Sequence, residues 1–162
     1  MNKIHVQKQL IIEKNVEDVW EVMGNQFAQV HLWSTNFKDS KPSGRSKFSG
    51  IDYSERITET NRGETIQELD SFDSTTHTLA YHISKGAPSI ANHASAVWSL
   101  KNNAANKTTV IIEFNMETKG FIGLLMTPLI KKGMGKSAME IAEDLKYYVE
   151  KGLPHPRKRK DI

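Results

Sequence analysis

The sequence predicts an α+β domain in which a curved antiparallel sheet packs against a long C-terminal helix. Two observations predict this fold class. Residues 53–118 form successive segments that read as strands, and short turns rich in Gly, Asn and Asp separate them. Short strands joined by short turns pair in antiparallel fashion. Apolar residues then recur at helical spacing over residues 127–151. A chain of 162 residues suits a single core.

The N-terminal segment predicts a strand followed by two short helices. Residues 4–12 alternate between apolar and polar side chains, which indicates a half-buried strand. Lys8 falls on the apolar face of this strand, where its amine can extend to the sheet edge or bind a ligand carboxylate. Asn15 is expected to cap the first helix, in which Val16, Val19, Trp20 and Met23 repeat at helical spacing. The second helix is expected over residues 27–33.

The middle of the chain predicts the remaining strands. Residues 34–50 are expected to form an edge strand with turns, which brings the sheet to about seven strands. Five further strands are expected at residues 53–59, 64–72, 77–84, 91–102 and 108–118. If the last two strands pair as a hairpin, the opposing residues are Trp98 and Val110, Ala96 and Ile112, and Ala94 and Phe114. One face of this hairpin is apolar and must be covered.

The C-terminal helix is the predicted cover. Its apolar stripe comprises Ile130, Met134, Ala138, Ile141, Leu145 and Tyr148 or Val149. Thr127 and Pro128 resemble the start of a helix or mark a kink in a longer one, and Gly152 and Pro154 end it. Residues 1–153 are therefore predicted as one domain. Residues 154–162 are predicted as a basic flexible tail in solvent, with contact to an anionic membrane or RNA as the alternative.

Composition excludes several classes of function. The chain has 22 basic and 19 acidic residues without a concentrated basic stripe, so no nucleic-acid partner is expected. It has no cysteine, which excludes disulfides, thiolate zinc sites and a cysteine nucleophile. No histidine spacing indicates a metal site, and no cofactor is expected. The sequence lacks a signal-like segment and a long apolar run, which predicts a cytoplasmic protein without stable membrane insertion. The oligomeric state is left open.

One glycine-rich stretch resembles a nucleotide-binding loop. Residues 133–138 read Gly-Met-Gly-Lys-Ser-Ala, but position 130 is isoleucine, so the full phosphate-loop spacing fails. The stretch also lies within the predicted helix instead of following a strand. We therefore expect no nucleotide there. The glycines are expected to let the helix bend or to admit a ligand close to its backbone.

The order of elements resembles the helix-grip fold, and the chain is similar to the START/Bet v 1-like (SRPBCC) superfamily, in particular its polyketide cyclase/dehydrase and lipid-transport group. The segments that carry the resemblance are residues 16–20, Trp33, Glu55-Arg56, residues 66–73, 79–83, 96–100 and 145–152. The resemblance implies a sheet of about seven strands wrapped around the C-terminal helix, with two short helices between the first two strands. It also implies a cavity between sheet and helix.

Strand parity then predicts the lining of that cavity. The expected ligand-binding residues are Tyr81, Ala94, Ala96, Trp98, Ile112, Phe114, Met134 and Ala138, with Trp33 near the mouth. Ala94 and Ala96 are small and leave room for a ligand, although a filled core is the alternative. The resemblance places Glu68 inward, as a ligand partner, an acid–base group, or a structural partner of Arg56 or Lys8. Tyr81 is expected to present its hydroxyl to the cavity or to be a core tyrosine.

Three functions remain open on the sequence alone. The first is a carrier or sensor that binds a small hydrophobic molecule such as a lipid, polyketide or aromatic compound. The second is an aromatase/cyclase-like enzyme in which Glu68 or Tyr81 transfers protons. The third is an interaction module that docks a partner through the helix and residues 34–50. The first is favoured because few polar residues are expected to point inward.

Overall fold

The computed structural model describes residues 1–160 and contains one antiparallel sheet of seven strands in the order β1-β7-β6-β5-β4-β3-β2. The strands are β1 (Asn2–Ile12), β2 (Asp39–Ser43), β3 (Glu55–Thr60), β4 (Gly63–Asp73), β5 (Thr78–Lys85), β6 (Ala91–Ala104) and β7 (Lys107–Thr118). The helices are α1 (Val16–Trp20), the π-helix η1 (Glu21–Asn25), the 3-10 helix η2 (Phe27–Leu32), α2 (Gly120–Leu125), α3 (Thr127–Lys151) and α4 (Pro156–Arg159). This architecture confirms the predicted α+β helix-grip fold.

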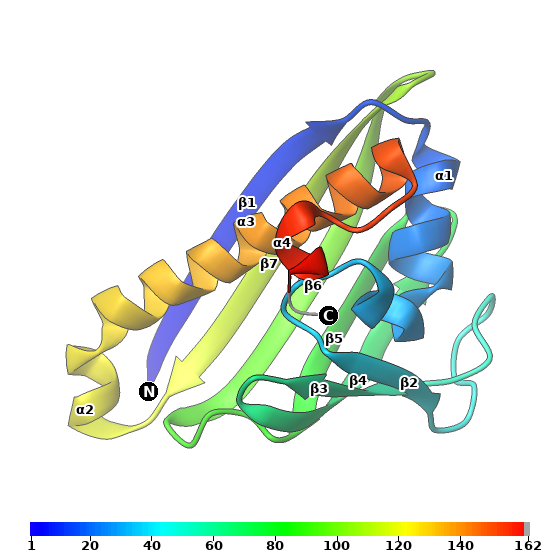
Figure 1. Ribbon diagram of the computed structural model, residues 1–162. Coiled ribbons are helices and arrows are strands. Elements are labelled where there is room, and N and C mark those ends of the chain that lie inside the picture. The colour runs from blue at the N-terminus through cyan, green and yellow to red at the C-terminus, as the bar shows by residue number, and fades with distance from the viewer. Residues whose placement is uncertain (161–162) are drawn as a thin grey trace.

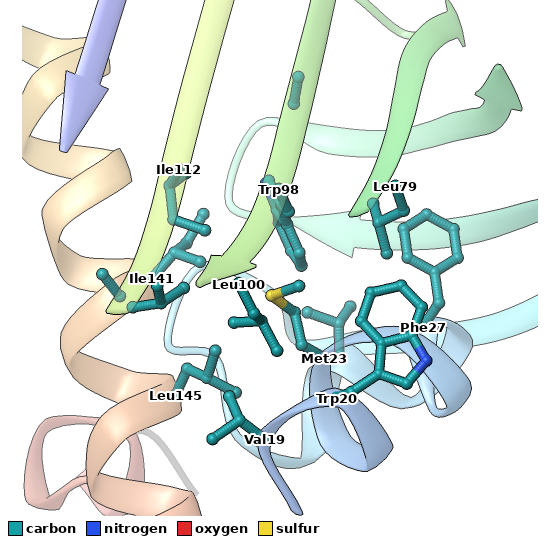
Figure 2. Close-up of a cluster of buried hydrophobic side chains, with 14 of the residues drawn as sticks. Val19, Trp20, Met23, Phe27, Leu79, Trp98, Leu100, Ile112, Ile141 and Leu145 are labelled. Atoms are coloured by element: carbon teal, nitrogen blue, oxygen red, sulfur yellow. The ribbon is translucent and has the colours of Figure 1, made fainter. Parts of the chain in front are cut away.

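Two segments cover the concave side of the sheet (Figure 1). The long helix α3 packs against β1 and β7, and η2 packs against β2 and β3. Between them lies the core, to which the short helices, the sheet and α3 all contribute (Figure 2). Its labelled members are Val19, Trp20, Met23, Phe27, Leu79, Trp98, Leu100, Ile112, Ile141 and Leu145. Within residues 1–160, no helix combines the length and apolarity needed to cross a membrane.

The hairpin of β6 and β7 has the predicted faces but a different register. Trp98 pairs with Ile112, Ala96 with Phe114 and Ala94 with Met116, each two residues further along β7 than expected. The strands pair as far as Ala104 and Lys107, with an irregularity after Asn102, so the turn is centred later than predicted. Because alternate residues of a strand share a face, a shift of two leaves the apolar face unchanged.

Asn15 caps α1 as predicted. Its side-chain oxygen accepts a hydrogen bond from the backbone N–H of Asp18 at 2.9 Å. This bond satisfies one of the free N–H groups of the first turn. The chain then continues through η1 and η2, so the second predicted helix is present in 3-10 form over Phe27–Leu32.

The substitution Asn15→Ala is expected to lower the free energy of unfolding by about 1 kcal/mol, because the Asp18 N–H loses its acceptor. Urea denaturation followed by far-UV circular dichroism measures the change. Asn15→Asp keeps an acceptor and serves as the matched control, with an expected loss of less than half that size. Equal stability of Asn15→Ala and the wild type would show that the cap contributes nothing.

The tail after α3 differs from the prediction of a flexible segment, because residues 154–160 fold back onto α3. Arg157 pairs with Asp144 at 2.8 Å and with Glu143 at 3.0 Å. Lys158 Nζ donates a hydrogen bond to the backbone carbonyl of Phe37 at 2.9 Å. The helical pattern did not reveal that Asp144 is fully buried and therefore needs a cation. Residues 161–162 of the predicted tail lie outside the described residues.

Candidate functional site

The interior between η2 and the sheet contains a buried arginine surrounded by aromatic rings. Arg56 extends inward from β3, and its side chain is fully shielded from solvent. The guanidinium carbon lies 3.8 Å from the ring centre of Phe27, 5.1 Å from those of Tyr81 and Trp98, and 5.3 Å from that of Phe37. Cations at such distances are attracted to the negative faces of aromatic rings. These rings therefore stabilise the charge of Arg56 in part.

Arg56 lacks the partners that a buried charge requires. Its Nε donates a hydrogen bond to Gln67 Oε1, and its Nη1 donates one to the carbonyl of Phe27, both at 2.7 Å. The buried Nη2 has no hydrogen-bond partner, and no carboxylate in residues 1–160 forms an ion pair with Arg56. Burying an unpaired charge is costly, and buried donors are nearly always satisfied in folded proteins. The site therefore holds a buried charge whose side-chain partners, Gln67 and the Tyr81 hydroxyl, are both neutral.

Burial also alters the acidity of the site. Desolvation lowers the pKa of Arg56 to about 10, while Tyr81 and Tyr53 act in the opposite direction. Desolvation likewise raises the pKa of the Tyr81 hydroxyl, and the charge of Arg56 opposes that rise. At neutral pH the site therefore combines a guanidinium cation with a neutral phenol. This pair can bind and stabilise an oxygen that carries negative charge.

Two tryptophans complete the cluster and add further free donors. The ring of Trp98 lies 5.6 Å from Tyr81 and 6.3 Å from Trp33. The indole N–H groups of Trp33 and Trp98 are both buried without an acceptor among the described residues. Trp33 was expected near a cavity mouth, but it is only 2% exposed and lies in the core. This expectation was wrong because residues 27–37 fold inward over the sheet.

The other predicted lining residues are divided between buried and partly exposed positions. Ala94, Ala96, Ile112 and Ala138 are buried, whereas Phe114 and Met134 are half-buried. Across the sheet, Ala96 lies between Tyr81 on β5 and Phe114 on β7. Ala96 is therefore a small residue between two aromatic rings on the concave face. The cavity expected between the sheet and the C-terminal helix stays a prediction.

Two grooves of the structure lie outside this cluster. One of about 600 Å³ runs between β1 and α3, and one of about 330 Å³ lies along β1 and the end of β7. Within residues 1–160, no group of three His, Asp or Glu side chains is placed to hold a metal ion.

Glu68 does not belong to the site, which corrects the expectation that it points inward. Its side chain lies on the outer face, 3.0 Å from Lys47 Nζ and 3.9 Å from His82 Nε2. The hydrogen bond from Lys47 lowers the pKa of this carboxyl. Neither Arg56 nor Lys8 is its partner.

A β-bulge explains the error. The pairing of β4 with β5 shifts between Leu69 and Ser71, so the inward positions of β4 change parity there. Gln67, Leu69 and Phe72 point inward and are buried, whereas Glu68 lies between two of them. A single extra residue in a strand moves the following side chains to the other face. Glu68 and Phe72 therefore lie on opposite faces of β4, although both are at even positions.

Arg56 is the candidate site residue that the sequence analysis did not predict. The signal was present in β3 and β4, where Arg56 pairs with Gln67 and Thr58 pairs with Thr65. All four are buried, so these two strands present a polar inner face. Polar residues at alternate positions of neighbouring strands normally indicate a sheet face that is exposed to solvent. Here that face is buried because residues 27–37 cover it.

Comparison with known proteins places this architecture among recognised relatives. Residues 3–150 match the family model described as polyketide cyclase/dehydrase and lipid transport. No curated protein sequence matches the chain.

Several solved structures share the fold at low sequence identity. A START superfamily protein from Mycobacterium smegmatis is 15% identical, with a TM-score of 0.75 over 90% of this chain and 97% of that one. The Zhui aromatase/cyclase from a Streptomyces species is 13% identical, with a TM-score of 0.75 over 92% and 94%. A norcoclaurine synthase point mutant from Thalictrum flavum is 12% identical, with a TM-score of 0.71 over 93% and 96%. At these identities the likeness concerns the fold alone.

Proposed function

Because this chain belongs to the polyketide cyclase/dehydrase and lipid-transport family, we propose that it binds a small hydrophobic molecule on the concave face of its sheet. Arg56 is the anchor for an acidic or enolic oxygen of that molecule. The protein acts as a carrier or sensor in the cytoplasm. The observation that carries the proposal is the buried guanidinium, which has a free Nη2 and no carboxylate partner among residues 1–160.

The chemistry of the site favours a planar ligand that carries an anionic oxygen. Three buried donors without acceptors belong to one cluster, namely those of Arg56, Trp33 and Trp98. An oxygen of a carboxylate, phenolate or enolate supplies both the acceptor and the charge that they lack. The surrounding rings favour an aromatic or polyketide-like body over a saturated chain.

The ligand body is proposed to lie along the row of Tyr81, Ala96 and Phe114. These residues are neighbours on three adjacent strands, so the two rings are separated by two strand spacings of about 4.8 Å each. Phe114 is partly exposed, as is Met134 on α3, so this end of the site is the proposed entrance. Ala94 continues the small-residue strip along β6.

Calorimetric binding of 2-naphthoate and its neutral analogue 2-naphthamide tests the role of Arg56. The wild type is expected to bind the carboxylate about 30-fold more tightly, because a charge-assisted pair with a buried group contributes about 2 kcal/mol or more. In Arg56→Met this preference is expected to disappear. The fold should survive, because replacing a buried charge by an apolar side chain of similar volume changes stability by little, about 2 kcal/mol at most.

Glu68→Gln is the matched control, because this carboxyl lies on the outer face and pairs with Lys47. It is expected to leave both affinities unchanged. Equal binding of the two naphthalenes by the wild type would contradict the assignment of Arg56. Failure of the wild type to bind any member of a panel of aromatic carboxylates would contradict ligand binding itself.

Cyclase-like catalysis is the second candidate, and the proximity of Tyr81 to Arg56 favours it. Arg56 is proposed to hold the oxygen of an enolate whose carbon attacks a second carbonyl of the same ligand. The neutral Tyr81 hydroxyl is proposed to donate its proton to the alkoxide that the attacked carbonyl oxygen becomes. A polyketone analogue that cyclises in the presence of the wild type and binds to Tyr81→Phe without cyclising would support this role. Carrier function alone predicts no acceleration by either protein.

A further inference from the structure

One end of the molecule carries an exposed apolar surface, which we call the apolar tip. It comprises Phe121, Ile122, Leu124, Leu125, Met126 and Leu129, in α2 and the first turn of α3. Five of these side chains are between 55% and 72% exposed. Single exposed apolar residues are common on proteins, but a contiguous cluster of this size indicates a contact surface. The projecting α2 is visible at the lower left of Figure 1.

The tip is held in place by contacts with Thr118, Thr127 and Asn2. Gly123 is buried, and a side chain there would collide with Thr118, because an added Cβ would lie 2.7 Å from Thr118 Oγ1. Thr127 Oγ1 donates a hydrogen bond to the carbonyl of Gly123 at 3.1 Å, and Asn2 Nδ2 donates one to Thr127 at 2.5 Å. The small face of α2 is therefore anchored to the protein, and its large apolar side chains point into solvent.

Lysines flank the tip along the sequence, and the nearest acidic residues in the sequence are Glu117 and Glu140, which pair with Lys3 and Lys136. Residues 118–139 contain four lysines and no Asp or Glu. Three of them, Lys131, Lys132 and Lys136, line the 600 Å³ groove between β1 and α3 together with Lys8. Lys8 reaches this groove past Gly135, whose missing side chain leaves room for the lysine stem. Lys8 therefore lies beside α3 on the edge strand β1.

We propose that the apolar tip docks onto an anionic lipid bilayer, with the surrounding lysines on the lipid headgroups. Apolar side chains enter the boundary between headgroups and acyl chains, while lysines bind the negative surface. The tip is far shorter than the roughly 20 residues of a spanning helix, so it lies at the interface. Contact with a second copy of this chain is disfavoured, because it brings like-charged lysine rims together.

Flotation of the protein with vesicles tests the proposal. The wild type is expected to partition onto vesicles of phosphatidylcholine with about 30% phosphatidylglycerol and to bind pure phosphatidylcholine at least tenfold more weakly. The double variant Phe121→Asp/Leu125→Asp is expected to lose about 30-fold in partition coefficient, because two buried apolar side chains are removed. The double variant Lys131→Glu/Lys132→Glu is expected to lose at least about 25-fold, because each lysine contributes about fivefold and each glutamate adds repulsion.

The matched controls lie elsewhere on the surface. Leu32→Asp removes an exposed leucine outside the tip, and Lys101→Glu/Lys107→Glu makes the same charge change near the β6–β7 turn. That turn lies at the opposite end of the molecule from α2 (Figure 1). Both controls are expected to partition within about twofold of the wild type. Thermal unfolding of each variant establishes that it is folded.

Two results would overturn the proposal. The first is equal partition of the wild type onto anionic and neutral vesicles, or no partition onto either. The second is a wild-type dimer by light scattering that Phe121→Asp/Leu125→Asp converts to a monomer, which would assign the tip to a second copy. Naphthoate binding by the tip variants is expected to stay unchanged, so failure of membrane docking is distinct from failure of the proposed ligand site.

Discussion

Replacing Trp98 with alanine is expected to lower the free energy of unfolding by about 4 kcal/mol. The indole is fully buried and contacts the rings of Phe27, Trp33 and Tyr81. It therefore joins the sheet to the segment that covers it. Removal of a buried tryptophan side chain loses its transfer free energy and leaves a cavity that a rigid aromatic cluster cannot close.

Urea denaturation by far-UV circular dichroism measures this loss. Val97→Ala is the matched control, because Val97 is the neighbouring residue on the outer face of β6 and is only partly buried. Its expected loss is about 1 kcal/mol. A loss for Trp98→Ala of similar size would contradict the packed interior described here and would favour an open cavity around the indole.

Replacing Arg157 with alanine is expected to lower the free energy of unfolding by about 3 kcal/mol. The substitution leaves the buried carboxylate of Asp144 with the backbone N–H of Thr35 as its remaining hydrogen-bond donor among the described residues. Breaking a buried ion pair costs about 3–5 kcal/mol, and the lower end applies because Arg157 itself is partly exposed.

A double-mutant cycle isolates this pair. Arg159→Ala is the matched control in the same short helix and is expected to change stability by about 0.5 kcal/mol or less. Combining Arg157→Ala with Asp144→Asn removes the unpaired charge and is expected to recover part of the loss. If Arg157→Ala were as stable as Arg159→Ala, residues 154–160 would be a solvated tail, as the sequence first suggested.

Alternation at period two made the sheet predictable from the sequence. The inner and outer faces of β6 and β7 follow directly from the positions of residues such as Trp98 and Ile112. The register error of two residues did not change the predicted faces, because a shift of two keeps each side chain on the same face of the sheet. The apolar stripe of α3 was also predictable from periodicity, because Ala138, Ile141 and Leu145 repeat at helical spacing.

The candidate site was harder to predict because it depends on contacts between distant segments. The bulge between Leu69 and Ser71 changes parity within β4 and carries no strong local signal, so Glu68 was placed on the wrong face. Arg56 becomes interior only because residues 27–37 fold over β3. The helix α2 was not predicted, because an apolar run with Gly120 and Gly123 fits no amphipathic pattern.

The open sheet leaves β1 and β2 as unpaired edges, where another chain could add a strand. Strand β2 is only five residues long and contains Pro42, which has no N–H to offer, beside the exposed Lys41. The helix α3 runs along β1. Pairing of edge strands between molecules is therefore disfavoured at both β1 and β2. The chain can expose the apolar tip without forming fibrous aggregates through its backbone.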